Sequence, residues 1–286
     1  MYKSKTGKML FHFFHEREQT FWLHFQRLQK HLNEEDIHNL RRSGKRIRAL
    51  YELFEQISDG EFSCKKRFKP IKNLFINAGL FREFQVSLNT LNTYSPSKNL
   101  VKAFKDSQQT ESAQAGENLK KAIENFKITR HLKSIKKARK LCKKIKRNNL
   151  EKNAKIYIQS QLAEIKNKIL LVPDEEALHA IRIAFKKISP VVSILELTKT
   201  SGFDKDLLLK IKEVEDKMGY WHDRVVLQEK MEKLLSSHSL SPEMVSECKL
   251  LISKLGNEHK SFIINIEMLV ERPQKKLAAA ISLDNS

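Results

Sequence analysis

Apolar residues recur at intervals of three and four along most of the chain, which is the spacing of an amphipathic α-helix. Glycine and proline are few, at eight and six in 286 residues. The pattern predicts an all-α protein whose first helices cover residues 14–31, 35–57 and 65–93, followed by one or two long helices over 115–149. A second series is predicted over 153–171, 175–199, 204–236 and 242–271. Polar segments at 95–99 and 236–243 separate helices, and residues 273–286 are expected to be a frayed tail.

Two segments of the chain share a spaced set of residues. EEDIHNLRRSGKRI at 34–47 and EEALHAIRIAFKKI at 175–188 have the same Glu pair, His, Arg, Lys and Ile at equivalent positions. Further on, AGLFREFQV at 78–86 matches MGYWHDRVV at 218–226 with nearly the same separation. The common order and separation indicate a duplicated unit of about 140 residues, which is long enough for a helical bundle and too long for a solenoid repeat.

The repeated histidine, arginine and lysine form a basic stripe on each predicted helix. At 100° per residue the stripe is about 80° wide and borders the apolar side of the helix, so we expect its cations at the edge of a crevice. The first stripe consists of His38, Arg41, Lys45 and Arg48, and the second of His179, Arg182 and Lys186. Ser189 and Pro190 take the place of Arg48 in the second copy, which is therefore expected to be shorter and differently angled.

A solvated helix face is the simplest explanation of a single basic stripe. The same order of His, Arg and Lys in both copies favours a functional role, because drift at solvated positions would have scrambled the charges. A protonatable donor one turn before an arginine suits a phosphate ligand.

A second basic element lies between the two copies. Residues 118–155 contain 15 Lys or Arg and two acids, Glu124 and Glu151. A membrane-surface helix and a nucleic-acid arm are the simpler explanations, but the other side of the predicted helix is aliphatic and lacks Trp, which favours packing in a bundle over lying on lipid. The basic side consists of Arg130, Lys133, Lys136, Lys137, Lys140, Lys144 and Arg147.

Charge and cysteine content narrow the classes of partner and compartment. The chain has 54 Lys and Arg residues and 34 Asp and Glu residues, which gives a net charge of +20. An anionic partner is therefore expected. Three widely separated cysteines match neither a zinc site nor a closed disulfide framework and fit the reducing cytoplasm. The N-terminal segment does not have the pattern of a signal peptide, and no apolar run is long enough to span a bilayer.

The paired motifs resemble the CHAD domain, the conserved-histidine α-helical domain. IHNLRRSGKRIR with AGLFREFQV, and LHAIRIAFKKI with MGYWHDRVV, carry the resemblance. It covers residues 12–272, with a first half at 12–149 and a second at 150–272. The resemblance implies two four-helix bundles related by pseudo-twofold symmetry, with a basic groove or pore between them. Glu83, His222 and the Ser189-Pro190 pair depart from the usual family pattern.

The resemblance also implies a non-catalytic protein that binds inorganic polyphosphate and needs neither a metal nor a cofactor. The residues expected to grip the phosphates are His38, Arg41, Lys45, Arg46 and Arg48 in the first half and His179, Arg182, Lys186 and Lys187 in the second. The basic element would extend the track through Arg130, Lys133, Lys137, Lys140 and Lys144.

Two other functions stay open at this stage. Binding of an RNA or DNA backbone is the main alternative, although aromatic residues lie in apolar patterns and not among the basic stripes, unlike in most binders of single strands. A metal-dependent phosphohydrolase would use the WHD string at 221–223 together with His179, yet Arg82 and Glu83 stand at the equivalent positions of the first copy. A protein at polyphosphate granules is an additional partner to consider.

Overall fold

The computed structural model describes residues 2–169, 174–237 and 240–283. All regular secondary structure in these ranges is helical, as the hydrophobic periodicity predicts. The helices of the first half are α1 (Lys5–Leu28), α2 (Glu34–Ile57), α3 (Cys64–Asn92), α4 (Lys98–Glu124) and α5 (Ile128–Cys142). Those of the second half are α6 (Arg147–Ile169), α7 (Glu175–Leu197), α8 (Lys205–Ser237) and α9 (Pro242–Ser282).

The two helices that carry the basic stripes begin in the same way. The side chain of Asn33 accepts a hydrogen bond from the Asp36 backbone N–H at 2.8 Å, and Asp174 accepts one from the Ala177 N–H at 2.7 Å. Acidic residues fill the first turn of both helices and interact favourably with the positive end of the helix dipole. These local signals fix where α2 and α7 start.

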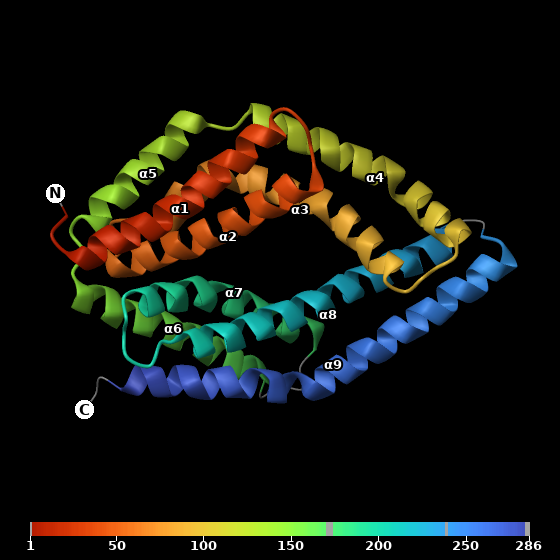
Figure 1. The fold of residues 1–286 in the computed structure, drawn as a ribbon. Coiled ribbons are helices and arrows are strands. Elements are labelled where there is room, and N and C mark those ends of the chain that lie inside the picture. Colours follow the sequence, from red (N-terminus) through yellow and green to blue (C-terminus); the bar gives the residue numbers. More distant parts are fainter. Residues whose placement is uncertain (1, 170–173, 238–239, 284–286) are drawn as a thin grey trace.

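The two halves of the chain touch at two places. Helix α2 packs against α6 and α7, and at the other end of the molecule α3 and α4 pack against α8 and α9 (Figure 1). At that far end the Tyr94 hydroxyl donates to Glu258 at 2.6 Å, and the Ser97 hydroxyl donates to Glu247 at 2.6 Å. Between these two junctions, α2 and α3 face α7 and α8 without filling the space between them.

One large hydrophobic core joins both halves. It includes Ile37, Leu40 and Ile47 of α2 together with Ile181 and Ile188 of α7, all with no exposed surface. A smaller cluster at the far junction combines side chains of α3, α4, α8 and α9. Because burial of apolar surface supplies most of the stability, the halves are expected to fold as one unit.

Buried polar pairs attach neighbouring helices to one another. The His131 Nε2 atom of α5 lies 2.8 Å from a Glu18 carboxylate oxygen of α1, with both residues buried beside Phe21 and Trp22. Such a pair stabilises only when it is intact, since a lone buried charge is costly. The pair therefore holds α5 against α1.

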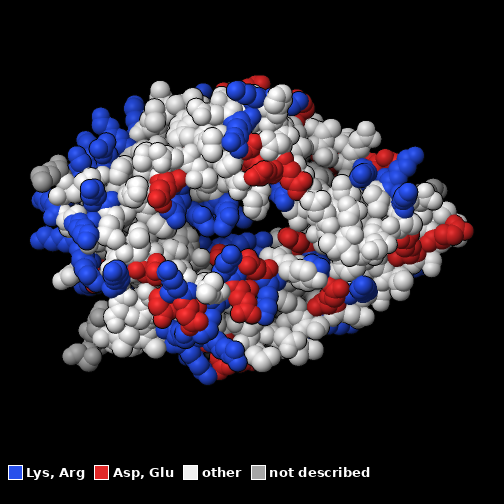
Figure 2. All heavy atoms as spheres, in the orientation of Figure 1, with Lys and Arg blue, Asp and Glu red and all other residues white. Residues whose placement is uncertain are grey.

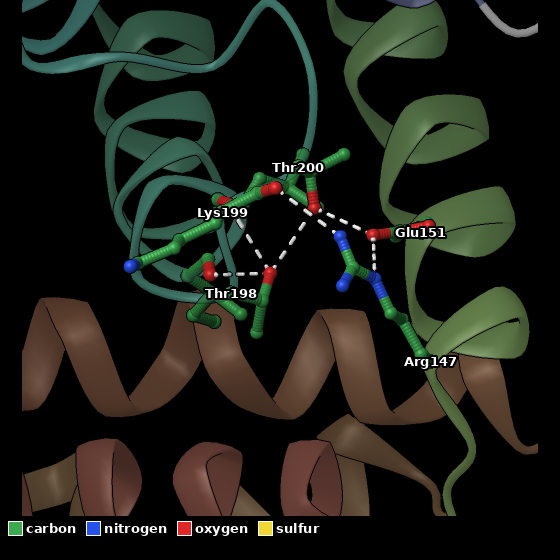
Figure 3. A network of polar contacts seen from close by, with 7 residues as sticks. Arg147, Glu151, Thr198, Lys199 and Thr200 are labelled. Atoms are coloured by element: carbon green, nitrogen blue, oxygen red, sulfur yellow. Dashed lines mark hydrogen bonds and ion pairs between the residues drawn. The ribbon is translucent and has the colours of Figure 1, made fainter.

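The turn after α7 is fixed by a hydrogen-bond network with the start of α6 (Figure 3). Arg147 donates from Nε to Glu151 at 2.7 Å and from a terminal nitrogen to the Lys199 carbonyl at 3.1 Å. The buried Thr200 hydroxyl donates to the same Glu151 carboxylate at 2.8 Å. Lys199 adopts a positive φ of 55°, and these contacts hold it there.

The one or two long helices predicted over 115–149 correspond to the end of α4, all of α5 and the start of α6, with breaks near residues 125–127 and 143–146. One sequence-based boundary is wrong. The tail predicted from residue 273 is instead the end of α9, where Leu277, Ala280 and Ile281 are buried against the core. Residues 284–286 of that predicted tail lie outside the described residues.

Gly7 tests how α1 is seated on α5. A Cβ atom at Gly7 would collide with the carbonyl oxygen of Cys142 and lie 3.2 Å from that of Ile145. We expect Gly7→Ala to lower the free energy of unfolding by about 2 kcal/mol, because backbone atoms must move to admit the methyl group. Gly256→Ala is the control, since no atom lies within 4 Å of its Cβ position, and alanine should stabilise α9 by roughly 0.5–1 kcal/mol. Urea denaturation measures the free energy of unfolding of both variants. Equal free energies of unfolding for Gly7→Ala and Gly256→Ala would contradict the close packing at Gly7.

Candidate functional site

A cavity of about 1000 Å³ lies between the two halves, lined by α2, α3, α7 and α8. Figure 2 shows it as a hollow near the middle of the molecule, with Lys and Arg atoms along its walls. Nine Lys or Arg side chains and four Asp or Glu side chains line it. The cations are Arg41, Arg42, Lys45, Arg46, Arg82, Arg182, Lys186, Lys205 and Lys212.

The centre of the basic wall is formed by two equivalent pairs, Arg41 and Lys45 of α2 and Arg182 and Lys186 of α7. All four side chains are half-buried, because α2 and α7 pack together through the apolar residues next to them. Of the two predicted stripes, these four cations and His38 line the cavity, whereas Arg48 and His179 do not. Cations of both halves therefore converge in one cavity.

Crowding of these charges lowers the pKa values of the two lysines. Burial, followed by the charges of Arg41 and Arg182, lowers the pKa of Lys45 to about 8. Burial, followed by the charges of Lys45 and Arg182, lowers the pKa of Lys186 to about 6. Removal from water and repulsion between like charges both disfavour the ammonium form. An anion in the cavity would reverse the second effect.

The two central arginines differ in how the protein holds them. Arg41 donates to the Phe75 carbonyl at 2.8 Å, lies over the Phe75 ring and rests against Gly79 of α3. The Arg182 Nε atom is buried and has no hydrogen-bond partner among the described residues. The Nε atom of Arg82, which also lines the cavity, is in the same state, and because guanidinium groups bind phosphate oxygens through paired N–H donors, both arginines have unused capacity for an anion.

Carboxylates on the α8 side of the cavity partly balance the cations. Burial raises the pKa of both Glu215 and Asp223, while the charges of Lys186 and other nearby cations oppose that rise. On the α3 side, the Glu83 carboxylate lies 3.4 Å from the Lys230 amine. The charged side chains that line the cavity therefore have a net positive charge, because the carboxylates are fewer than the cations.

The two repeated histidines lie at the margin of the cationic wall. His38 lines the cavity, and the ring of His179 lies 5.5 Å from that of His222, which also lines it. Burial and neighbouring cations lower the pKa of His38 and His179, and lower that of His222 to about 3. These imidazoles are accordingly neutral donors at neutral pH.

Several predicted site residues lie elsewhere. Arg48 points away from the cavity and pairs with Glu52 at 3.2 Å, and Lys187 does not line it either. The predicted track along α5 does not adjoin the cavity, because α5 packs on the outside of α1 and α3. These displaced residues are Arg130, Lys133, Lys137, Lys140 and Lys144. Helix α5 lies at the upper left in Figure 1, and Lys and Arg atoms gather toward the left end of the same view in Figure 2.

Pro190 does not end the second stripe. Helix α7 continues through it to Leu197, and both Ser189 and Pro190 line the cavity. Since Arg48 lies outside the cavity, its replacement by Ser189 removes no cation from the wall. Helix α7 still places only Arg182 and Lys186 in the cavity as cations, whereas α2 places Arg41, Arg42, Lys45 and Arg46 there.

The sequence-based reasoning did not identify Arg42, Arg82, Lys205 and Lys212 as site residues. Arg82 lies in the repeated segment at 78–86, so the repetition of that segment could have indicated that Arg82 belongs to the site. Lys205 and Lys212 are seven residues apart, which places them on one side of α8, but nothing in the sequence indicates that this side faces α2.

In the described part of the chain, no three His, Cys, Asp or Glu side chains cluster in a way that could hold a metal ion. Among the described helices, none has a stretch long and apolar enough to cross a bilayer.

The comparisons with known proteins agree on the fold. The chain resembles the crystal structure of the CHAD domain from the plant Ricinus communis, with a TM-score of 0.67, 13% identity and coverage of 93% of this chain and 91% of that one. It is equally similar to PptA from Streptomyces chartreusis, with a TM-score of 0.67, 14% identity and coverage of 94% and 100%. No curated protein matches the sequence significantly. The family model of the CHAD domain matches residues 19–232, and the chain therefore belongs to the CHAD domain family.

Proposed function

We propose that this protein binds inorganic polyphosphate in the cavity between its halves and does not catalyse a reaction on it. The observation that carries the proposal is the convergence of Arg41, Lys45, Arg182 and Lys186 at one half-buried wall, where the Arg182 Nε atom lacks a partner among the described residues. Buried cations of this kind are costly unless an anion compensates them. Membership of the CHAD family and the strongly positive net charge support the proposal.

The composition of the cavity favours a phosphate polymer over a nucleic acid. Among the described residues no Phe, Tyr or Trp side chain lines it, so unpaired bases would have no such ring on which to stack. Polyphosphate has no bases and carries about one charge per unit, which suits a wall of cationic donors. The proposal includes the duplication of one helical unit, because α2 and α7 supply equivalent Arg and Lys residues to the wall.

Competition binding tests the choice of ligand. Long-chain polyphosphate and single-stranded RNA compete for the full chain at two salt concentrations. We expect polyphosphate to bind more tightly at both, with a steep loss of affinity as salt rises because bound phosphates release counterions. Equal or tighter binding of RNA would overturn the proposed ligand, and release of phosphate by the pure protein with Mg²⁺ would overturn the absence of catalysis.

Gly79 and Gly219 provide a matched test of the arginine wall, since they occupy equivalent positions of the two repeated segments. A Cβ at Gly79 would collide with the Arg41 guanidinium, whose Cζ lies 2.9 Å away, whereas no atom lies within 4 Å of a Cβ at Gly219. We expect Gly79→Ala to weaken polyphosphate binding about tenfold, because it displaces one charge-assisted donor. Gly219→Ala should bind as the wild type does. Calorimetry with both variants checks this, and equal affinities would show that the position of Arg41 is unimportant.

A further inference from the structure

Helix α5 has an outer surface that takes no part in the cavity. One side of the helix is buried against α1 and α3 through His131, Ser134 and Ala138. The opposite side is exposed, and its side chains cover an arc of about 140° around the helix axis. This α5 outer surface consists of Ile128, Leu132, Lys133, Lys136, Arg139 and Lys140.

The positive charge of the α5 outer surface is not neutralised by the protein. No Asp or Glu occurs from residue 125 to residue 150, and among the described residues no carboxylate forms an ion pair with its four cations. Exposed lysines of α8 differ in this respect, because Lys210 lies 2.8 Å from Asp206 and Lys217 lies 2.7 Å from Glu213. The four cations of α5 are therefore available to an anionic partner.

Two aliphatic side chains lie among these cations. Ile128 is 43% exposed and Leu132 is 50% exposed, and a spacing of four residues makes them neighbours on the helix surface. Arg139 falls between them in angle around the helix axis, so the apolar pair belongs to the same surface as the charges. The aliphatic side of α5 packs in the bundle as expected, except for this pair. Cations beside exposed aliphatic side chains are typical of helices that lie at the boundary between lipid headgroups and acyl chains.

Other anionic partners suit this surface less well. The phosphates of a nucleic-acid duplex would attract the cations but would leave the aliphatic pair in water. A single strand needs free aromatic rings, whereas Phe11 of α1, which packs beside α5, lies beneath Arg139 at 5.6 Å and stacks on His15. A helical peptide needs a groove, and α5 lines neither the cavity between the halves nor the smaller one between α3 and α4. A broad anionic surface with an apolar layer beneath its charges fits best.

We propose that the α5 outer surface binds anionic lipid membranes. Lys133, Lys136 and Lys140 contact the acidic headgroups, while Ile128 and Leu132 insert at the depth of the headgroup boundary. The inference does not depend on the proposed function, because α5 lies on the outside of the molecule and does not adjoin the cavity (Figure 1).

Sedimentation of the full chain with vesicles tests the charges. We expect binding to vesicles of phosphatidylcholine and phosphatidylserine and little binding to phosphatidylcholine alone. Replacing Lys133, Lys136 and Lys140 together by Gln should weaken binding by about a hundredfold, at about fivefold for each charge removed near the membrane. The matched control replaces three exposed lysines of α9 by Gln, and it should weaken binding by less than about fivefold. These control residues are Lys249, Lys254 and Lys260.

Equal losses in the two triple variants would show that only the net charge matters, and would overturn the inference. Equal binding of the wild type to both kinds of vesicle would also overturn it. Circular dichroism checks that both triple variants keep their helices, which is expected because the replaced side chains are exposed and Gln is nearly as good a helix former as Lys.

Leu132→Gln tests insertion at constant charge. It should weaken binding to the anionic vesicles by about fivefold, because roughly half of a leucine side chain no longer leaves water. Leu250→Gln is its control, since Leu250 is 74% exposed on α9 and should have no effect. Duplex RNA serves as the competing partner. Unchanged vesicle binding by Leu132→Gln, or loss of RNA binding without loss of vesicle binding in the α5 triple variant, would overturn the inference.

Discussion

Replacement of Arg182 by methionine is expected to lower the affinity for polyphosphate by about tenfold to a hundredfold, because one or more charge-assisted hydrogen bonds are lost. Arg182 is an informative target because its Nε atom is buried without a partner among the described residues, so its removal breaks no hydrogen bond of that atom within the helix bundle. Methionine fills much of the same apolar volume. Isothermal titration calorimetry measures the affinity, and circular dichroism checks that the helices persist.

Controls for this variant come from cations that lie away from the cavity. Arg48 pairs with Glu52 outside the cavity, and Lys140 is exposed on α5. Arg48→Met and Lys140→Met should each change the affinity by less than about fivefold, the range of a solvent-exposed charge. If Lys140→Met weakened binding as much as Arg182→Met, the polymer would bind along α5 and not in the cavity.

Replacement of Lys186 by methionine should have opposite effects on stability and on binding. The folded-state pKa of Lys186, about 6, lies below its ordinary value of 10.5. Between these values the unfolded chain binds more protons, so the free energy of unfolding rises with pH and falls on acidification. At pH 7 the folded protein therefore carries a cost on the order of 3 kcal/mol that methionine removes. The variant should be more stable than the wild type but bind polyphosphate more weakly.

The same groups make binding depend on pH. Contact with phosphate favours the ammonium form, so the complex takes up protons at Lys45 and Lys186 when their free pKa values are about 8 and about 6. Affinity should rise as pH falls from 8.5 to 6, by up to about tenfold per unit for each proton taken up. Protonation of Glu215 and Asp223, whose pKa values are raised, acts in the same direction.

Thermal unfolding with and without polyphosphate measures both effects together. The rise in melting temperature caused by polyphosphate should be larger at pH 6.5 than at pH 8.5 in the wild type and should vary less in Lys186→Met. Lys187→Met is the neighbouring control, since Lys187 does not line the cavity. A rise that is independent of pH in the wild type would contradict proton uptake by the lysine pair.

These properties depend on how α2 and α7 are placed relative to each other. The spacing of Arg41 and Lys45, and of Arg182 and Lys186, is enough to put each pair on one side of its helix, next to the apolar side. That much could be predicted, because helix periodicity is a local property. Arg48 belongs to the same 80° stripe and yet pairs with Glu52 outside the cavity. A rotation of a few tens of degrees around the helix axis is enough to move a side chain from the cavity to solvent.

The basic segment before α6 shows a second limit. Its periodicity leaves open whether it forms one long helix or two, whereas in the structure α5 ends at Cys142 and begins without a side-chain cap. The position of α5 depends on the buried pair of His131 with Glu18, which are 113 residues apart. Nothing within the segment indicates that its cations face away from the other half.

The sequence by itself determined the helical class, the positive charge, the starts of α2 and α7, and the order of cations along them. These features depend on residues that are close together in the sequence, so they can be predicted without knowledge of the tertiary structure. Only the tertiary structure decided which cations share a cavity, that the end of α9 is buried, and that Lys45 and Lys186 lose basicity. Burial and charge repulsion act through space, between side chains that are more than a hundred residues apart in sequence.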